Sequence, residues 1–302
     1  MTIKEPPTSM QARPTTKTIV LVSVMHFLFF SFQGVTQESG CLWSIGKSEE
    51  QLSGFIYGTM HIIPKDEFDP PEMMDSLIST CDKVVTEIAL DLYIEEQFDL
   101  ASAMVLGKNI TLADFIDSSQ MAGLNRLFID TLNISESLLQ NQYYNLKPVF
   151  ISTMVLKDLV GPAIAADQWV GDLAKKHGIE LGSLESIYDQ IGFIDSIPMK
   201  TQLEWLLELN SDMEKEYRNM LRIYQKGDLD SLLLISQMDP NSKADSELRA
   251  MRNRNWIDRI ENHLTEGKTL FAVGALHLPG TDGVLELLKA QGFEVRVVRT
   301  EK

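Results

Sequence analysis

Two of the five histidines in this 302-residue chain follow a glycine by three positions at the end of an apolar segment. The first pattern runs from Gly58 to His61 and the second from Gly274 to His277, while Glu87 ends the apolar segment KVVTEI between them. Imidazole and carboxylate groups are ligands for zinc, manganese, cobalt and iron. A metal with an open coordination position acidifies bound water and polarises a carbonyl. The residues therefore predict a divalent-metal site, with His61, His277 and Glu87 as ligands, suited to hydrolysis.

Hydrolysis at such a metal also needs a general base and a group that stabilises negative charge. Glu185, which follows a short apolar segment, and Glu87 are both candidates for the base, although Glu185 is equally well explained as a surface acid. Arg252 is a candidate to stabilise developing negative charge or to hold a site carboxylate. The neighbouring Asn253 lies on the apolar face of a predicted helix, so its amide needs internal partners; a structural clamp between helix and sheet is the alternative explanation.

The elements that carry these residues predict an α/β fold. Near the start, a hairpin over residues 42–60, a helix from about 69 to 79 and a strand over 83–88 form a βαβ unit. The end of the chain repeats the design with a strand over 269–273, a helix over 282–291 and a strand over 293–298. Parallel strands deliver their carboxyl ends to one edge of a sheet, so His61 and Glu87 are expected at the same edge.

The remainder of the chain is predicted to be mostly helical. A long helical insertion covers about residues 92–160, and the segments that follow it are a helix, a short strand and two further helical stretches, over 167–177, 180–184, 202–238 and 245–266. We find no tandem repeat and no low-complexity linker. The sequence thus predicts a mixed sheet built from two βαβ units with a helical insertion between them, in a single domain over residues 35–302.

The first 34 residues have the pattern of an export signal. Lys4, Arg13 and Lys17 precede an apolar run from Ile19 to Phe32 that is too short to span a bilayer comfortably. Cleavage is expected after Gly34, and an uncleaved anchor is the alternative. The protein is therefore predicted to be exported, to a periplasmic or extracellular location, with membrane contact only if this segment is retained.

Composition narrows the function classes. The net charge of -16 argues against a nucleic-acid partner, because phosphate binding depends on clustered Lys and Arg. The two cysteines, Cys41 and Cys81, cannot form a four-cysteine zinc site. The motifs of zincins, serine hydrolases, P-loop proteins and dinucleotide-binding proteins are missing from the sequence.

The paired motifs and their surroundings resemble the TraB/GumN family, which is related to the Tiki metalloproteases and more distantly to erythromycin-esterase-like proteins. The segments that carry the resemblance are LWSIGK, FIYGTMHI, KVVTEI, RNRNWIDRI and FAVGALHLPGTDGVLELLKAQGFEVRVV, and it covers about residues 42–298. One departure is AADQW around Asp167, where bacterial members more often have a glycine before the aspartate.

This resemblance implies a metal-dependent, peptidase-like site with metal or catalytic roles for His61, Glu87 and His277. It favours manganese or cobalt as the metal, with zinc as a further candidate, and it places Arg252 and Asn253 in a polar motif. We therefore predict an exported metal-dependent hydrolase, of the peptidase class, that acts on a peptide or protein substrate. The alternatives are a non-catalytic protein that sequesters a peptide or signal on the helical insertion, and a hydrolase of esters or small molecules.

Overall fold

The computed structural model describes residues 40–48, 51–89, 94–238 and 242–299. They all belong to one compact unit, Glu38–Lys302. The predicted export signal over residues 1–34 lies outside the described residues. Among the helices that are described, none has the length and apolar character needed to cross a bilayer.

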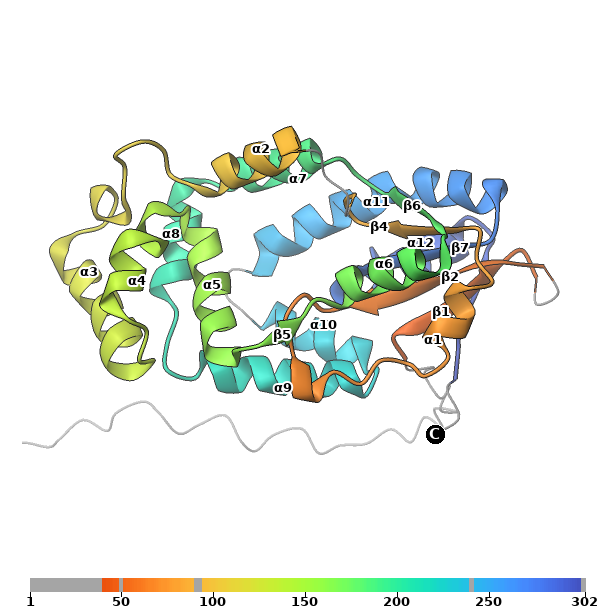
Figure 1. Cartoon of the computed structure of the whole chain (residues 1–302), viewed down its shortest axis with the longest axis horizontal. Helices are drawn as coiled ribbons and strands as arrows, with labels where there is room; N and C mark the ends of the chain where they lie inside the picture. Colours follow the sequence, from red (N-terminus) through yellow and green to blue (C-terminus); the bar gives the residue numbers. More distant parts are fainter. Residues whose placement is uncertain (1–39, 49–50, 90–93, 239–241, 300–302) are drawn as a thin grey trace, which may run out of the picture. The chain divides into compact units, whose positions relative to one another are not determined.

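The centre of the fold is a six-stranded mixed sheet with the order β6-β4-β7-β2-β1-β8 (Figure 1). Its strands are β1 (Leu42–Gly46), β2 (Leu52–Thr59), β4 (Lys83–Thr86), β6 (Glu180–Ser183), β7 (Thr269–Gly274) and β8 (Glu294–Val297). The neighbours β2, β7, β4 and β6 run parallel, whereas β1 is antiparallel to both β2 and β8. The predicted α/β fold with a mixed sheet is confirmed.

The strands of each predicted βαβ unit are parallel but not adjacent. β7 pairs between β2 and β4, with Thr269 opposite both Gly54 and Lys83. In the same way, β2 and β1 lie between β7 and β8. The two βαβ units are therefore interleaved within the one mixed sheet. The reason is that β7 is the most apolar strand, and a strand buried on both faces belongs at the centre of a parallel sheet.

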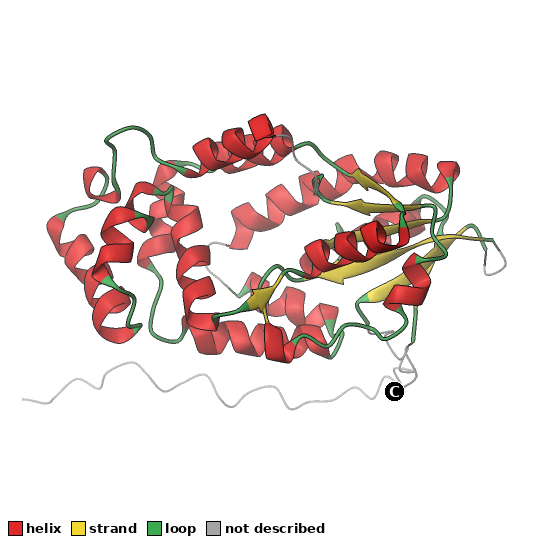
Figure 2. Cartoon of the chain, viewed as in Figure 1, coloured by secondary structure: helices red, strands yellow, loops and turns green. Residues whose placement is uncertain are grey.

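Twelve α-helices are described; some cover the sheet and others form a helical part beside it (Figure 2). They are α1 (Met74–Ile78), α2 (Ile94–Met104), α3 (Ser118–Asn125), α4 (Glu136–Asn141), α5 (Pro148–Val160), α6 (Ala166–His177), α7 (Ile187–Ser196), α8 (Met199–Leu207), α9 (Met213–Gln225), α10 (Leu229–Gln237), α11 (Ser242–Glu266) and α12 (Val284–Ala290). The helix predicted from residue 69 begins only at Met74, because the Met74 N–H donates to the Pro71 carbonyl in a preceding turn. Helix α7 was not predicted, although Ser186 and Asp189 form a capping box at its start.

The handedness of the connections decides which helices cover which face of the sheet. The steps from β2 to β4 and from β4 to β6 move toward one edge, and those from β6 to β7 and from β7 to β8 move toward the other. Right-handed crossovers then place α1 and α6 on one face and α11 and α12 on the opposite face. The contacts agree, since α1 packs on α6 and α11 packs on α12 (Figure 1).

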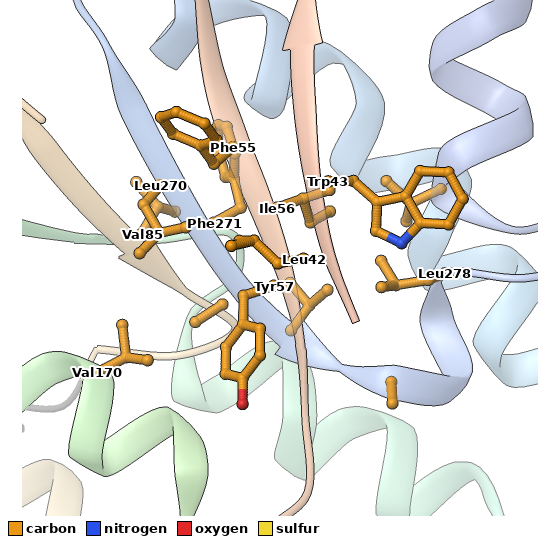
Figure 3. Packing of buried hydrophobic residues seen from close by; sticks show 14 of the residues in the cluster. Leu42, Trp43, Phe55, Ile56, Tyr57, Val85, Val170, Leu270, Phe271 and Leu278 are labelled. Carbon is orange, nitrogen blue, oxygen red and sulfur yellow. The ribbon is translucent and has the colours of Figure 1, made fainter. Parts of the chain in front are cut away.

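The main hydrophobic core lies on both faces of this sheet. Figure 3 shows part of it around β1, β2 and β7. On the α11 face, Trp256, Ile257 and Ile260 are buried in the same cluster. One side of α11 is thus fixed against the sheet by packing, which also fixes the polar residues immediately before Trp256.

A second hydrophobic cluster belongs to the helical part of the chain. Its buried members come from residues 112–155 together with Leu206 of α8, and α5 packs on α8. Local caps begin two of its elements: Thr111 forms a capping box with Asp114, and Ser135 accepts a hydrogen bond from the Leu138 N–H. A short two-stranded pair, β3 (Ile63–Pro64) with β5 (Ala163–Ile164), joins the segment after His61 to the segment before α6.

Gly58 permits a close approach between the two Gly-x-x-His segments. A Cβ atom at this position would lie 2.9 Å from Leu278 Cδ1 and 3.1 Å from the Cα of Ala275. Backbone at that distance cannot move aside without disturbing the turn that carries His277. A glycine is therefore required here for packing.

We predict that Gly58→Ala lowers the free energy of unfolding by about 1–3 kcal/mol, the cost of overpacking a core. Gly123→Ala is the matched control, since the exposed Gly123 lies within α3 and its added Cβ meets no atom within 4 Å. That control should raise stability by about 0.5–1 kcal/mol. Urea unfolding measures both, and equal effects of the two substitutions would contradict the packing role of Gly58.

Candidate functional site

Four of the predicted site residues emerge at one edge of the sheet. His61, Glu87, Glu185 and His277 follow the parallel strands β2, β4, β6 and β7. A cavity of about 500 Å³ opens at this edge, and His61, Glu87 and His277 line it together with Arg252 from α11. The structure therefore brings the residues selected from the sequence into one place.

Glu87 is buried and fixed by hydrogen bonds. Its side chain is only 11% exposed, and its Oε1 accepts a 2.7 Å hydrogen bond from the Gly274 N–H. Its Oε2 lies 2.5 Å from Nη2 of Arg252. Burial opposes ionisation of Glu87, but His277, Arg252 and the Gly274 N–H together lower its pKa to about 2. Glu87 is therefore anionic at neutral pH.

Gly274 contributes more than its N–H group. A Cβ atom on this residue would lie 3.2 Å from Oε1 of Glu87 and 3.5 Å from the His277 ring. The glycine of the second Gly-x-x-His pattern thus leaves room for the carboxylate that it also binds.

Arg252 joins the two buried carboxylates. Its Nη2 lies 2.5 Å from Oε1 of Glu185, and its Nε lies 3.3 Å from Oε2 of the same side chain. Glu185 is 4% exposed and accepts further hydrogen bonds from Gln190 and from the Trp256 indole. The sequence suggested that Arg252 holds a site carboxylate, and in the structure it forms ion pairs with both Glu87 and Glu185. The proposed role of Glu185 as a base stays a prediction.

His277 is buried with one defined tautomer. Asn253 donates its amide N–H groups to the carbonyls of His277 and Asp282, at 3.2 and 2.7 Å, which turns its Oδ1 toward the imidazole. Nδ1 of His277 lies 2.5 Å from that oxygen and must donate to it. Nε2 then carries a lone pair, and it accepts from Nη1 of Arg252 at 3.3 Å because a guanidinium only donates. Asn253 is thus the clamp between helix and sheet that the sequence suggested, and it also orients His277.

Burial keeps His277 neutral. The residue is 6% exposed and its ring lies 4.4 Å from the Trp256 ring. Loss of solvation lowers its pKa to about 3, because Glu87 compensates only in part and Arg252 acts in the same direction as burial. A neutral imidazole, whose Nε2 carries a lone pair, is the form that binds a metal; in this structure that lone pair accepts from Arg252.

His61 lies in a different environment. Its side chain is 61% exposed, and its Nδ1 lies 3.3 Å from Oδ1 of Asp167. The β3–β5 pair and a hydrogen bond from the Ala166 N–H to the Met60 carbonyl bring the start of α6 to this point. The hydrogen bond to Asp167 raises the pKa of His61 above its ordinary value, although partial loss of solvation opposes this.

Both histidines therefore use Nδ1 for a fixed partner, so Nε2 is the ring nitrogen that could coordinate a metal. This is the arrangement that protein metal sites use to orient a histidine ligand. Nε2 of His277 lies 3.9 Å from Oε1 of Glu87. Within the described residues, however, no three His, Cys, Asp or Glu side chains are already close enough together to hold a metal. The donor types fit a divalent metal, and Arg252 provides the positive charge beside Glu87 in this structure.

Other residues of this region were not identified from the sequence as parts of the site. Asp167 was recognised only as a departure from a family pattern, since 106 positions separate it from His61. Thr59 and Tyr217 also line the cavity; Thr59 lies within the first Gly-x-x-His pattern, whereas nothing in the local sequence distinguishes Tyr217. The sequence indicated only that Trp256 is an apolar residue of a helix, not that it contacts the site.

The cysteines do not contribute a reactive thiol. Both Cys41 and Cys81 are free. Burial raises the pKa of Cys41 to about 12 and that of Cys81 to about 11. A thiol with such a pKa is protonated at neutral pH and is a poor nucleophile.

Comparison with known proteins gives one match. The TraB/PrgY/gumN family model matches residues 41–297, which include every site residue described above. No curated protein and no solved structure matches the chain.

We predict that Glu185→Gln destabilises the fold by about 3 kcal/mol, because the two carboxylate oxygens of Glu185 accept buried hydrogen bonds from Arg252, Gln190 and Trp256, and an amide would place a donor against some of these donors. Lys200→Ala is the control, since Lys200 is 87% exposed and pairs with Glu204 on the same helix. Its effect should stay below about 0.5 kcal/mol. Chemical denaturation of both variants measures the difference. A Glu185→Gln variant as stable as the wild type would show that the buried pair adds no stability.

The low pKa of His277 predicts a pH dependence of stability. The unfolded chain binds a proton at this residue near pH 6.5 and the folded chain only near pH 3, so stability is complete above pH 6.5 and falls as the pH falls. The loss between pH 6.5 and 5 should be about 2 kcal/mol. Urea unfolding of chelator-treated protein measures it, with His277→Gln expected to flatten the profile in this interval. An unchanged profile in that variant would assign the dependence to another group.

Proposed function

The chain belongs to the TraB/PrgY/gumN family, and from the geometry of the sheet edge we propose that it is an exported metal-dependent hydrolase that cleaves peptide bonds. The observation that carries the proposal is the matched pair of histidines. Each has its Nδ1 fixed by a partner, Asp167 or Asn253, and each lines the cavity that also contains the anionic Glu87. Export is proposed from the pattern of residues 1–34 alone.

We propose His61, Glu87 and His277 as the residues that hold the metal. The donor set suits manganese, cobalt or zinc, and family membership favours the first two. When bound, a divalent metal acidifies a water molecule and polarises a substrate carbonyl. Asn253 keeps Nε2 of His277 unprotonated for this purpose, and the Gly274 N–H holds the Glu87 carboxylate in place.

We propose that Arg252 and Glu185 serve to stabilise the negative charge that develops during hydrolysis. Arg252 presents guanidinium N–H groups at the cavity wall, where they can donate to the oxygen that becomes negative as a carbonyl is attacked. Glu185 holds the guanidinium through two contacts and does not line the cavity, so we propose that it positions Arg252. Glu87 is then the carboxylate nearest the substrate.

A non-catalytic binding protein is the second candidate. The observation that favours it is the ion pair between Glu87 and Arg252, which already neutralises the carboxylate. In that case the cavity would hold a peptide without turnover. A labelled peptide recovered intact after long incubation with metal-loaded protein would support this second function.

We predict that the full-length chain purifies with about one divalent metal ion, and that His61→Ala and His277→Ala each lower the metal content and abolish peptide cleavage. Elemental analysis measures the first, and digestion of a peptide library with manganese, cobalt or zinc measures the second. His177→Ala is the control, because His177 lies at the end of α6 beside Asp75 and should leave both readouts unchanged. Equal metal content in the wild type and in a variant lacking both site histidines would refute the proposal.

A further inference from the structure

Two of the side chains proposed as metal ligands already contact a cation of the chain itself. Nη1 of Arg252 lies 3.3 Å from Nε2 of His277, and Nη2 of Arg252 lies 2.5 Å from Oε2 of Glu87. The unprotonated nitrogen of a neutral imidazole has a single lone pair, and a metal bound to it lies about 2.1 Å away. An ion at that place would collide with Nη1. Arg252 and a metal therefore cannot share the lone pair of His277.

Charge leads to the same conclusion at Glu87. The side chains of Glu87 and Arg252 are 11% and 18% exposed, so water screens the charges around them only weakly. A guanidinium that stayed in contact with Glu87 would lie within a few ångströms of a divalent ion on the same carboxylate. The two cations would repel each other strongly, so Arg252 has to release Glu87 when a metal binds.

This overlap accounts for a feature of the site. The donor types fit a divalent metal, yet no three ligand side chains of the described residues are close enough together to hold one. Nε2 of His277 is 3.9 Å from Oε1 of Glu87, and the guanidinium of Arg252 is bonded to both side chains. Arg252 thus bridges the two proposed ligands as a metal would.

Arg252 also has partners that it can keep when these contacts are broken. Its Nε and Nη2 contact the two carboxylate oxygens of Glu185, which Gln190 and the Trp256 indole hold in place. Its Cζ lies 4.9 Å from the Trp256 ring and 5.8 Å from the Phe193 ring, both within the range of a cation–π contact. These groups provide a second position for the guanidinium beside the cavity wall.

We propose that Arg252 and a divalent metal are alternative cations at His277 and Glu87, and that metal binding transfers the guanidinium to Glu185 alone. The transfer releases Nη1, which can then donate to the oxygen of a substrate carbonyl in the cavity that Arg252 lines. Binding the metal and preparing Arg252 for catalysis are thus one event. The exchange rests on the metal ligands of the proposed function, but it does not depend on which reaction follows.

The test measures the affinity of the full chain for Mn²⁺ by titration calorimetry, without a substrate. Arg252→Gln should bind Mn²⁺ at least about tenfold more tightly than the wild type does, because the competing cation is removed from both ligands. Mn²⁺ should also raise the melting temperature of this variant more than that of the wild type. Equal or weaker affinity in the folded variant, checked by circular dichroism, would overturn the inference.

Arg249→Gln is the matched control. Arg249 lies about one turn before Arg252 on α11, lines the same cavity and has a side chain that is only 11% exposed. Its partner is Asp245, not a proposed metal ligand. The control removes the same charge, and its affinity for Mn²⁺ should stay within about threefold of the wild type. An equal gain in both variants would assign the effect to the net charge of the cavity and would also overturn the inference.

A second measurement uses the wild type and is independent of how well Arg252→Gln folds. A crystal structure of the full chain with Mn²⁺ should show Nη1 of Arg252 beyond hydrogen-bonding distance of Nε2 of His277, with the contacts to Glu185 retained. A hydrogen bond between Arg252 and His277 that persists beside bound Mn²⁺ would rule out the exchange.

The outcomes separate this inference from the proposed function. Tight Mn²⁺ binding in Arg252→Gln with none in the wild type supports the competition and refutes a metal-dependent hydrolase. Peptide cleavage by the manganese-loaded wild type, with no gain of affinity in Arg252→Gln, supports the hydrolase and refutes the exchange. Absence of Mn²⁺ binding in both proteins refutes both.

Discussion

The site depends on one cation, the guanidinium of Arg252. Glu87 and Glu185 are both buried at the end of neighbouring strands, with side chains 11% and 3% exposed. Two carboxylates in that position would repel each other and lose their hydration, which is a large unfavourable term without a compensating charge. Arg252 contacts both of them and also Nε2 of His277. One guanidinium therefore links the three buried groups of the site.

The position of Arg252 is in turn fixed by packing. Trp256 and Ile260 of α11 are buried against the sheet, and Asn253 bonds to the backbone at His277 and Asp282. Helix α11 thus combines the apolar contacts that dock it with the polar groups that complete the site. The right-handed crossover from β6 to β7 decides which face of the sheet α11 covers. The topology of the sheet therefore also determines which polar groups reach its edge.

Much of this could be predicted from the sequence, and the limits have physical reasons. Apolar runs, caps and turn residues gave the strands and most helices, and parallel strand ends gave the common edge for His61, Glu87 and His277. Strand order could not be obtained in this way, because periodicity carries no information about which strand β7 pairs with. The contact between His61 and Asp167 was also inaccessible, since it is created by the short β3–β5 pair between distant segments.

The repeated Gly-x-x-His pattern also conceals a difference that only the structure reveals. After Thr59 the chain bends at His61 before it enters β3, and His61 remains largely exposed beside a carboxylate. After Gly274 it coils into a short 3-10 turn over Ala275–His277, which buries the second imidazole against Trp256. The same four-residue spacing therefore yields one histidine whose pKa is raised and one whose pKa is lowered. Because the backbone beyond each strand decides the outcome, equal motifs at one sheet edge provide two unlike groups, and an asymmetric site needs no asymmetric motif.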